Sequence, residues 1–149
     1  MKSPVEQFTI KTFVPLEAFG YDISFTNASL FMVLSVIVSS LFLYLGIKKS
    51  SLIPNRFQSS VELLYEFVSN MVKENVGTGG KKYFPFIFSL FMFILFGNLL
   101  GMIPYSYTFT SQIIVTITLA LIIFIGVTLI ALIKHKLKFF TLFFPSGVP

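Results

Sequence analysis

The chain has 149 residues, of which 55% are hydrophobic and 11% charged, with a mean hydropathy of +0.87 and no cysteine. A soluble domain of this size usually carries about a quarter charged residues, so the composition excludes an ordinary cytosolic domain, a disordered segment and a disulfide scaffold. The net charge of +5 comes from basic residues in the gaps between long apolar runs. We therefore interpret these residues as indicators of membrane topology. The composition therefore indicates a membrane protein.

Residues 1–29 form a predicted outer N-terminal segment, which lacks the compact apolar stretch of a signal peptide. We expect this segment to stay on the mature protein. A first transmembrane helix is predicted at 30–47, because this run is uncharged and apolar over about the length that the bilayer core requires. Thr26 and Asn27 suit the start of this helix, since their side chains can accept hydrogen bonds from its unpaired N–H groups.

Residues 56–76 predict an amphipathic helix of about five turns that lies along the inner membrane surface. An alternative is that its apolar stripe packs on a partner subunit. At 100° per residue, the stripe holds Phe57, Val61, Leu64, Tyr65, Val68, Met71 and Val72, and the opposite face holds Gln58, Ser59, Glu62, Glu66, Ser69 and Lys73. We interpret Glu62 and Glu66 as part of a solvated face rather than as a proton-handling pair, because nothing in the sequence buries them.

Two further transmembrane helices are predicted at 83–103 and 109–133, and residues 134–149 form an inner C-terminal segment. Pro85 falls in the first turn of the earlier helix, where its missing N–H costs little. Because the connection between these two spans is short, they form a predicted antiparallel hairpin. The predicted fold class is all-α integral membrane, with three transmembrane helices and one amphipathic surface helix.

Lysine and arginine predict the orientation of the chain, because they are enriched in the inner loops of membrane proteins. With the N-terminus outside, the inner segments hold nine of these residues and the outer segments hold two. The inner set is Lys48, Lys49, Arg56, Lys73, Lys81, Lys82, Lys134, Lys136 and Lys138, and the outer set is Lys2 and Lys11. We therefore predict that the N-terminus is outside and the C-terminus inside.

The residues available for chemistry are few. Without cysteine and with His135 as the one histidine, in a basic flank, the sequence predicts neither a metal site nor a cysteine or histidine nucleophile. His135 is expected at the surface near lipid headgroups. The six acidic residues all lie outside the three predicted spans, so the informative residues are the uncharged polar ones inside them.

Asn98 is the main polar residue of the second span, and Gly97 and Gly101 around it form a small-xxx-small pattern that allows close helix packing. Gln112 and Thr116 lie near the outer end of the third span, together with Ser111 and Thr118. In one interpretation Asn98 and Gln112 bond each other and only hold helices together. In the other, Asn98, Gln112 and Thr116 line a hydrated path that enters the membrane from the outer side.

Several stretches resemble subunit a of the F-type ATP synthases, in its alphaproteobacterial or mitochondrial form. They are SPVEQF at 3–8, YFP at 83–85, LFMF at 90–93, NLLGMIPYS at 98–106, KH at 134–135 and FPSGVP at 144–149. Each stretch is weak alone, but together they are specific and run from end to end. The resemblance implies the same order of spans and surface helix as the one predicted above.

This resemblance also implies a function. It suggests a non-catalytic stator subunit that offers protons two offset half-channels beside the ring of c subunits, with b-type stator subunits, other ATP synthase subunits and membrane lipid as partners. The family's asparagine that matches Asn98 is associated with the outer half-channel. No cofactor and no nucleic acid are implied. A bacterial plasma membrane and a mitochondrial inner membrane both fit as the location. The alternative function is that of a structural membrane subunit whose polar residues serve helix packing only.

One departure from the family concerns its essential arginine. In the family this residue lies on a long tilted helix that follows the stretch matching 144–149. Arg56 is the single arginine of the chain and sits in a region without a matching motif, so the role is not carried over to it. We therefore expect the chain to be the N-terminal portion of the subunit.

Overall fold

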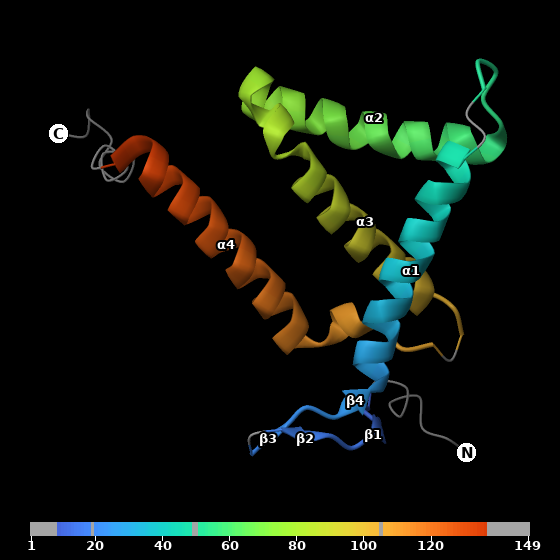
Figure 1. Cartoon of the computed structure of the whole chain (residues 1–149), viewed down its shortest axis with the longest axis vertical. Coiled ribbons are helices and arrows are strands. Elements are labelled where there is room, and N and C mark those ends of the chain that lie inside the picture. Colours follow the sequence, from blue (N-terminus) through green and yellow to red (C-terminus); the bar gives the residue numbers. More distant parts are fainter. Residues whose placement is uncertain (1–8, 19, 49–50, 105, 137–149) are drawn as a thin grey trace. The chain divides into compact units, whose positions relative to one another are not determined.

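A computed structural model describes residues 9–18, 20–48, 51–104 and 106–136, and it is mostly helical (Figure 1). The chain divides into two compact units, one ending at Thr110 and the other beginning at Ser111. The motifs at 3–8 and 144–149, as well as Lys49 and Lys138, lie outside the described residues.

The N-terminal segment contains short strands that the sequence analysis did not predict. They are β1 (Thr12–Val14), β2 (Glu17–Ala18), β3 (Tyr21–Asp22) and β4 (Phe25–Thr26). Strand β1 pairs antiparallel with β4, opposing Thr12 to Thr26, and β2 pairs antiparallel with β3. Gly20, in the turn between β2 and β3, has a φ of 80°, a left-handed conformation that glycine adopts without strain. The segment therefore forms a small folded piece in front of the first span.

Helix α1 spans Asn27–Lys48 and begins with the predicted cap. The Ser29 N–H donates to Thr26 Oγ1 at 3.4 Å, and the Thr26 N–H donates to Ser29 Oγ at 2.8 Å. Asn27 also holds the preceding segment, since its Nδ2 donates to the Thr9 carbonyl at 3.0 Å. The buried residues of α1 are small or polar, namely Asn27, Ala28, Ser35, Ser39 and Gly46. Small residues of this kind let neighbouring helices approach closely within a membrane.

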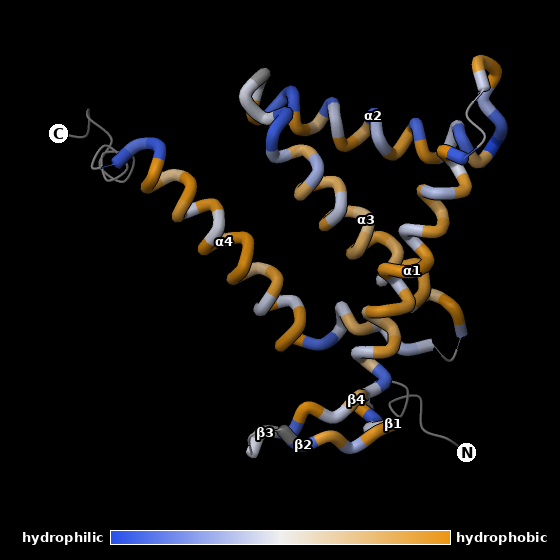
Figure 2. Tube along the Cα trace, viewed as in Figure 1, coloured by the Kyte–Doolittle hydropathy of each residue, from blue (hydrophilic) through white to orange (hydrophobic). Residues whose placement is uncertain are grey.

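Helix α2 spans Arg56–Val76 and is the amphipathic helix expected between the first two spans. Asn55 caps its start, because its Oδ1 accepts from the Arg56 N–H at 2.7 Å. It ends at Gly77, whose N–H donates to the Lys73 carbonyl and whose φ is 71°. Figure 2 shows the resulting alternation of hydrophilic and hydrophobic residues along α2, in contrast to the largely hydrophobic α1, α3 and α4.

The buried face of α2 differs from the predicted stripe. Val61, Val68 and Val72 are buried as expected, but Gln58 is 8% exposed although it was assigned to the polar face. Its amide is satisfied there, because Nε2 donates to the Ser51 carbonyl and to Glu62 Oε1, and Oε1 accepts from the Ser51 N–H. The outer part of the predicted stripe is exposed, with Phe57 at 55%. The face that packs on α1 and α3 is therefore rotated toward Gln58.

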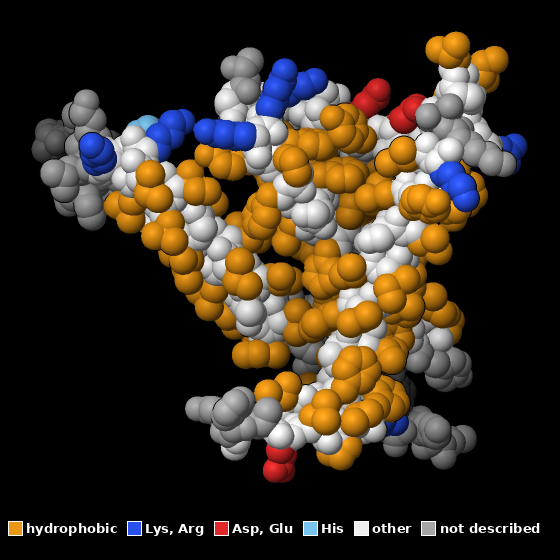
Figure 3. All heavy atoms as spheres, viewed as in Figure 1, with side chains coloured by type: hydrophobic (Ala, Val, Ile, Leu, Met, Phe, Trp, Pro, Cys, Tyr) orange, Lys and Arg blue, Asp and Glu red, His pale blue; other side chains and the backbone are white. Residues whose placement is uncertain are grey.

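Helix α3 spans Phe84–Gly101, with Pro85 in its first turn as predicted, and follows the 3₁₀ helix η2 (Gly77–Lys82). It packs along α1, where the Phe42 and Phe96 ring centroids lie 5.4 Å apart. Helix α2 contacts both α1 and α3 and lies across their ends (Figure 1). Over α1 and α3 the face in view is mostly hydrophobic, whereas charged side chains gather over α2 (Figure 3).

Helix α4 spans Ile113–His135 in the second unit, after the short 3₁₀ helix η3 (Phe109–Ser111). Helices α1, α3 and α4 are each long and apolar enough to cross a membrane, and none of the residues of α4 is buried. The predicted all-α membrane class with three spans is thereby confirmed, with the short N-terminal strands as an addition. The hairpin of the last two spans stays a prediction.

Candidate functional site

Asn98, the residue predicted to line a path through the membrane, lies in the last turn of α3 and is exposed. Its Nδ2 donates to the Ile94 carbonyl at 2.9 Å, and its Oδ1 accepts from the Thr110 hydroxyl at 2.7 Å. The amide is therefore anchored both within α3 and to the segment that follows the helix. Among the described residues, these bonds use one of its two N–H donors and one of its two acceptor positions.

Gly97 is buried because the chain folds back over it after α3. A Cβ atom at Gly97 would lie 2.6 Å from Cε1 of Phe109. The Phe109 ring is fully buried, at 0% exposure, and also packs on Phe93 with ring centroids 5.1 Å apart. Because glycine has no side chain, the Phe109 ring can pack directly against the backbone at Gly97 and cover the end of α3.

Gly101 makes a second close approach to the same returning segment. A Cβ atom there would lie 2.8 Å from Cβ of Thr108. The turn between them is held by the Ser106 hydroxyl, which donates to the Leu100 carbonyl at 2.6 Å. In this unit the small residues of α3 are therefore covered by Thr108 and Phe109, and their role in packing whole helices stays a prediction.

Gln112 and Thr116, the other two predicted lining residues, belong to the second unit. Gln112 directly precedes α4, and its carbonyl accepts from the N–H groups of Val115 and Thr116 at 3.1 and 3.2 Å. The exposed Thr116 hydroxyl donates to the Ile113 carbonyl at 3.0 Å. Thr116 thus satisfies its own hydroxyl proton within α4 and keeps its oxygen as an acceptor.

The structure therefore places Asn98 with Thr110, a partner that the sequence analysis did not name. Phe109 was missed as well, since it was counted only as the first residue of an apolar run. A signal was present in the sequence: glycines at 97 and 101, four positions apart, lie next to a short connection that carries aromatic residues, one of which is Phe109. Close approach of a backbone and a ring to such glycines is a common use of small residues.

Other candidate residues lie outside this site. Glu62 and Glu66 are exposed, and Glu62 accepts a hydrogen bond from Gln58, in agreement with a solvated face. His135 is exposed at the end of α4. Among the residues that the structure describes, no group of three histidine, aspartate or glutamate side chains could hold a metal ion.

Comparison with known proteins connects these features to a family. The family described as "ATP synthase A chain" matches residues 29–149, which is most of the chain. The chain belongs to this family. It is thus a multi-pass membrane protein, with its three apolar spans inside or overlapping the matched region.

Curated proteins named "ATP synthase subunit a" are similar to the chain over nearly its whole length. Those of Rhodospirillum rubrum and Paramagnetospirillum magneticum are 52% and 51% identical over 100% of the chain and 62% of their own length. That of Parvibaculum lavamentivorans is 49% identical over 98% of the chain and 56% of its own length. All three organisms are alphaproteobacteria. The chain thus spans about three fifths of the length of these relatives.

Proposed function

We propose that the chain contributes to a proton-translocating stator subunit of a rotary F-type ATP synthase. In this proposal it lines part of the outer half-channel, beside the c-subunit ring and held by b-type stator subunits, in a bacterial plasma membrane or mitochondrial inner membrane. Membership in the ATP synthase A chain family and the three apolar spans support this assignment. The subunit is non-catalytic and acts by guiding protons.

The observation that carries the proposal is the Asn98 amide near the end of the mostly apolar span α3. A polar side chain within a span is costly and therefore tends to serve a function. Asn98 is exposed, and among the described residues its bonds to Ile94 and Thr110 leave one N–H and one acceptor position for other partners. It can thus hold a water molecule on the open side of α3 while its own position stays fixed.

An amide suits such a role because it neither gains nor loses a proton at physiological pH. In the proposed mechanism, Asn98, Gln112 and Thr116 orient water molecules that pass protons inward from the outer side. The protons then neutralise a carboxylate on the rotor, travel with the ring and leave on the inner side, so that a proton gradient drives rotation. The chain's residues supply orientation and hydrogen bonds, and the titrating group is on the rotor.

A structural role is the second candidate, and the same site provides the observation that favours it. Two contacts hold the end of α3 to the following segment: the 2.7 Å hydrogen bond from Thr110 to Asn98 and the packing of the Phe109 ring on Gly97. Hydrogen bonds between side chains inside membranes contribute about 0.6 kcal/mol on average. In this case Asn98 would serve packing alone.

The deciding experiment uses the assembled ATP synthase in membrane vesicles, with Asn98→Leu and Thr110→Val compared side by side. Both variants remove the bond between the two residues, but only Asn98→Leu removes the amide. We expect Asn98→Leu to lower proton-driven ATP synthesis and passive proton flow about tenfold or more, which corresponds to an added barrier of about 1.4 kcal/mol. We expect Thr110→Val to keep most of the ATP synthesis and most of the proton flow.

Asn75→Leu is the matched control. Asn75 also donates from its Nδ2 to the carbonyl four residues earlier, at 2.8 Å, but it lies on α2 outside the spans. We expect this variant to keep full proton flow, and the amount of assembled enzyme is measured for all three variants. Equal losses in Asn98→Leu and Thr110→Val, or unchanged synthesis in Asn98→Leu with assembly intact, would support the structural role instead.

A further inference from the structure

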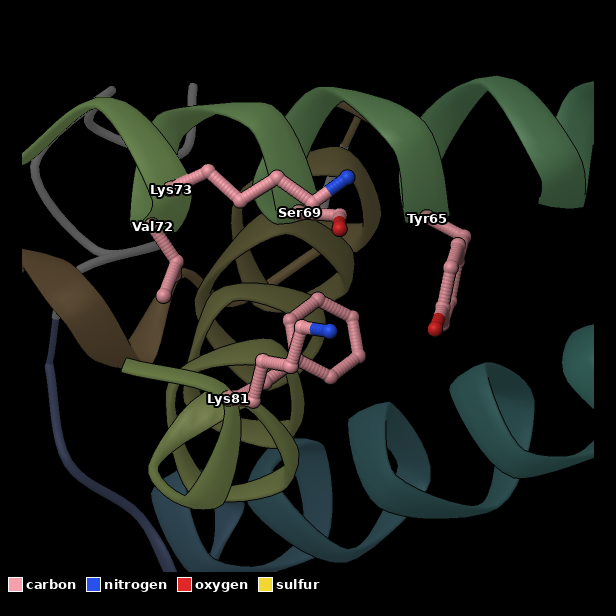
Figure 4. A pocket seen from close by; sticks show the side chains of 6 residues that line it. Tyr65, Ser69, Val72, Lys73 and Lys81 are labelled. Carbon is pink, nitrogen blue, oxygen red and sulfur yellow. The ribbon is translucent and has the colours of Figure 1, made fainter. Parts of the chain in front are cut away.

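A cavity of about 370 Å³ lies between the last turns of α2 and the start of α3 (Figure 4). This volume is in the range of small-molecule sites in proteins. Its lining comes from three elements of the first unit: Tyr65, Ser69, Val72 and Lys73 on α2, Lys81 on η2, and Phe84 on α3. Nothing in the proton path described above uses this cavity.

Two lysines enter the cavity from different elements because the chain reverses tightly between them. Helix α2 stops at Gly77, and the glycine-rich η2 turns the chain back toward α2. Gly80 is buried in this turn, where a Cβ atom would lie 2.9 Å from Cγ1 of Val72. The close approach of Gly80 to α2 brings Lys81 to the same cavity as Lys73.

The polar side of the cavity consists of hydrogen-bond donors. In Figure 4 the Lys73 side chain runs along α2 and ends near Ser69, Lys81 extends toward the same space from below, and the Tyr65 ring borders it. Neither lysine forms an ion pair with a carboxylate among the residues that the structure describes. Two ammonium groups with two hydroxyls match an anion that offers several oxygen acceptors, and a phosphate group is such an anion.

The apolar side and the position of the cavity identify the source of that phosphate. Val72 and Phe84 are the aliphatic and phenyl side chains of its lining, and the Phe84 ring packs on Tyr65 with centroids 4.8 Å apart. Phe84 is the first residue of the apolar span α3, and Lys81 lies just before it, which places the lysines at the level of lipid headgroups. We propose that this cavity binds the headgroup phosphate of an anionic phospholipid, with the adjoining glycerol and acyl chains against Val72 and Phe84.

The test uses the full chain in detergent micelles, with lipid binding measured by native mass spectrometry. The probes are phosphatidylglycerol as the anionic lipid, phosphatidylcholine as the neutral one, and inorganic phosphate as a competitor. We expect one phosphatidylglycerol molecule to bind in preference to phosphatidylcholine and to resist millimolar phosphate. Lysines near a membrane surface each contribute about fivefold in affinity for anionic lipid, so Lys73→Gln with Lys81→Gln should weaken this binding about 30-fold.

Two further variants separate the cavity from general surface charge. Lys48→Gln with Lys82→Gln removes the same charge at span ends of the first unit, but neither residue lines the cavity, and each ammonium lies over a neighbouring tyrosine ring. This control should bind as the unaltered chain does. Ser69→Leu keeps every charge and fills the space between the lysines, and we expect it to lose binding as the Lys73 and Lys81 variant does.

Several outcomes would overturn the proposal. Equal losses in the two lysine pairs would show charge attraction without a site, and unchanged binding in Ser69→Leu would show that the cavity is not occupied. Equal binding of phosphatidylcholine would exclude selection for an anion. Displacement by inorganic phosphate at millimolar concentration would assign the site to free phosphate rather than to lipid. Far-ultraviolet circular dichroism of each variant establishes that the helices are retained.

Discussion

The two ends of α3 use different chemistry to meet the rest of the first unit. At the Gly101 end, the chain folds back on two glycines, an aromatic ring fills the space, and one amide accepts a hydroxyl hydrogen bond. At the Phe84 end, α2 and η2 leave a cavity that two lysines enter. One end is closed by uncharged contacts and the other is open and basic. The same apolar helix thus has one end that is closely packed and one end that borders a basic cavity.

The largest expected effect concerns which end faces which side. The chain has no cysteine, so single cysteines at the exposed Met102 and Gly79 report the two ends without background. We expect an impermeant thiol reagent to label Met102→Cys only from the outer side and Gly79→Cys only from the inner side, because the basic end should face inward. The reverse pattern would overturn the predicted orientation. Labelling of both cysteines from the same side would contradict the prediction that the two ends of α3 lie on opposite sides of the membrane.

Removal of the Phe109 ring should have the largest effect on stability at the closed end. Phe109→Ala leaves a cavity over Gly97 and should lower the free energy of unfolding in detergent by about 3 kcal/mol. Phe86→Ala is the control, because Phe86 lies on the same α3 helix and is 56% exposed. Thermal unfolding followed by circular dichroism measures both variants. Similar losses in the two would mean that the Gly101 end is not specially packed.

A methyl group added at Gly97 tests the contact between Gly97 and the Phe109 ring by changing the glycine instead of the ring. Gly97→Ala would place its Cβ 2.6 Å from Cε1 of Phe109, so we expect a loss of about 2 kcal/mol from overpacking. Gly126→Ala on α4 is the matched control, since nothing lies within 4 Å of a Cβ there. That substitution should be neutral or stabilise by up to about 1 kcal/mol through helix propensity. An equally tolerated Gly97→Ala would show that Phe109 is free to move aside.

The smallest effect concerns pH. Residues 97–110 contain no acidic, basic or histidine side chain, so the closed end of α3 should be insensitive to acid. Asp22 differs, because hydrogen bonds from the Ser24 hydroxyl and then from the Ser24 N–H lower its pKa below the ordinary 3.8. The contribution of this carboxylate to folding stability is therefore present in full well above pH 3.8 and is lost as the pH falls through the lower folded pKa.

Nuclear magnetic resonance of the Ser24 amide measures this titration. The midpoint of the signal change should lie below pH 3.8, and Ser24→Ala should return the pKa of Asp22 toward its ordinary value. Ring signals of Phe109 should stay constant over the same range. A change at Phe109 that follows Asp22 would mean that the N-terminal strands and the closed end of α3 are coupled.

Local patterns predicted the helices well. The three spans follow from apolar length, and α2 follows from a 3.6-residue period between Pro54 and Gly77. The caps at Thr26 and Gly77 also depend only on neighbouring residues and were predictable. The four strands have two or three residues each, too short to produce an alternating pattern, and they were not predicted.

Contacts between distant residues were not predictable from the same patterns. Gln58 is buried because the loop at Ser51 supplies its hydrogen-bond partners, which no helical wheel contains. Phe109 belongs to an apolar run, yet it packs on a glycine twelve positions earlier. Asn98 was identified by its polarity alone, whereas its partner Thr110 depends on how the chain turns after α3. The cavity at Lys73 and Lys81 likewise depends on the turn of η2.

The placement of α2 has a consequence for how the membrane-embedded helices can move. Helix α2 contacts α1 and α3 together, and at one of these contacts Val61 lies so close to Gly46 that a Cβ there would be 3.1 Å from the Val61 Cβ. Sliding of α3 along α1 would therefore break the contacts of α2 with one of the two helices. We therefore expect α1, α2 and α3 to move together as one rigid group, so that the two spans tilt together and do not slide past each other.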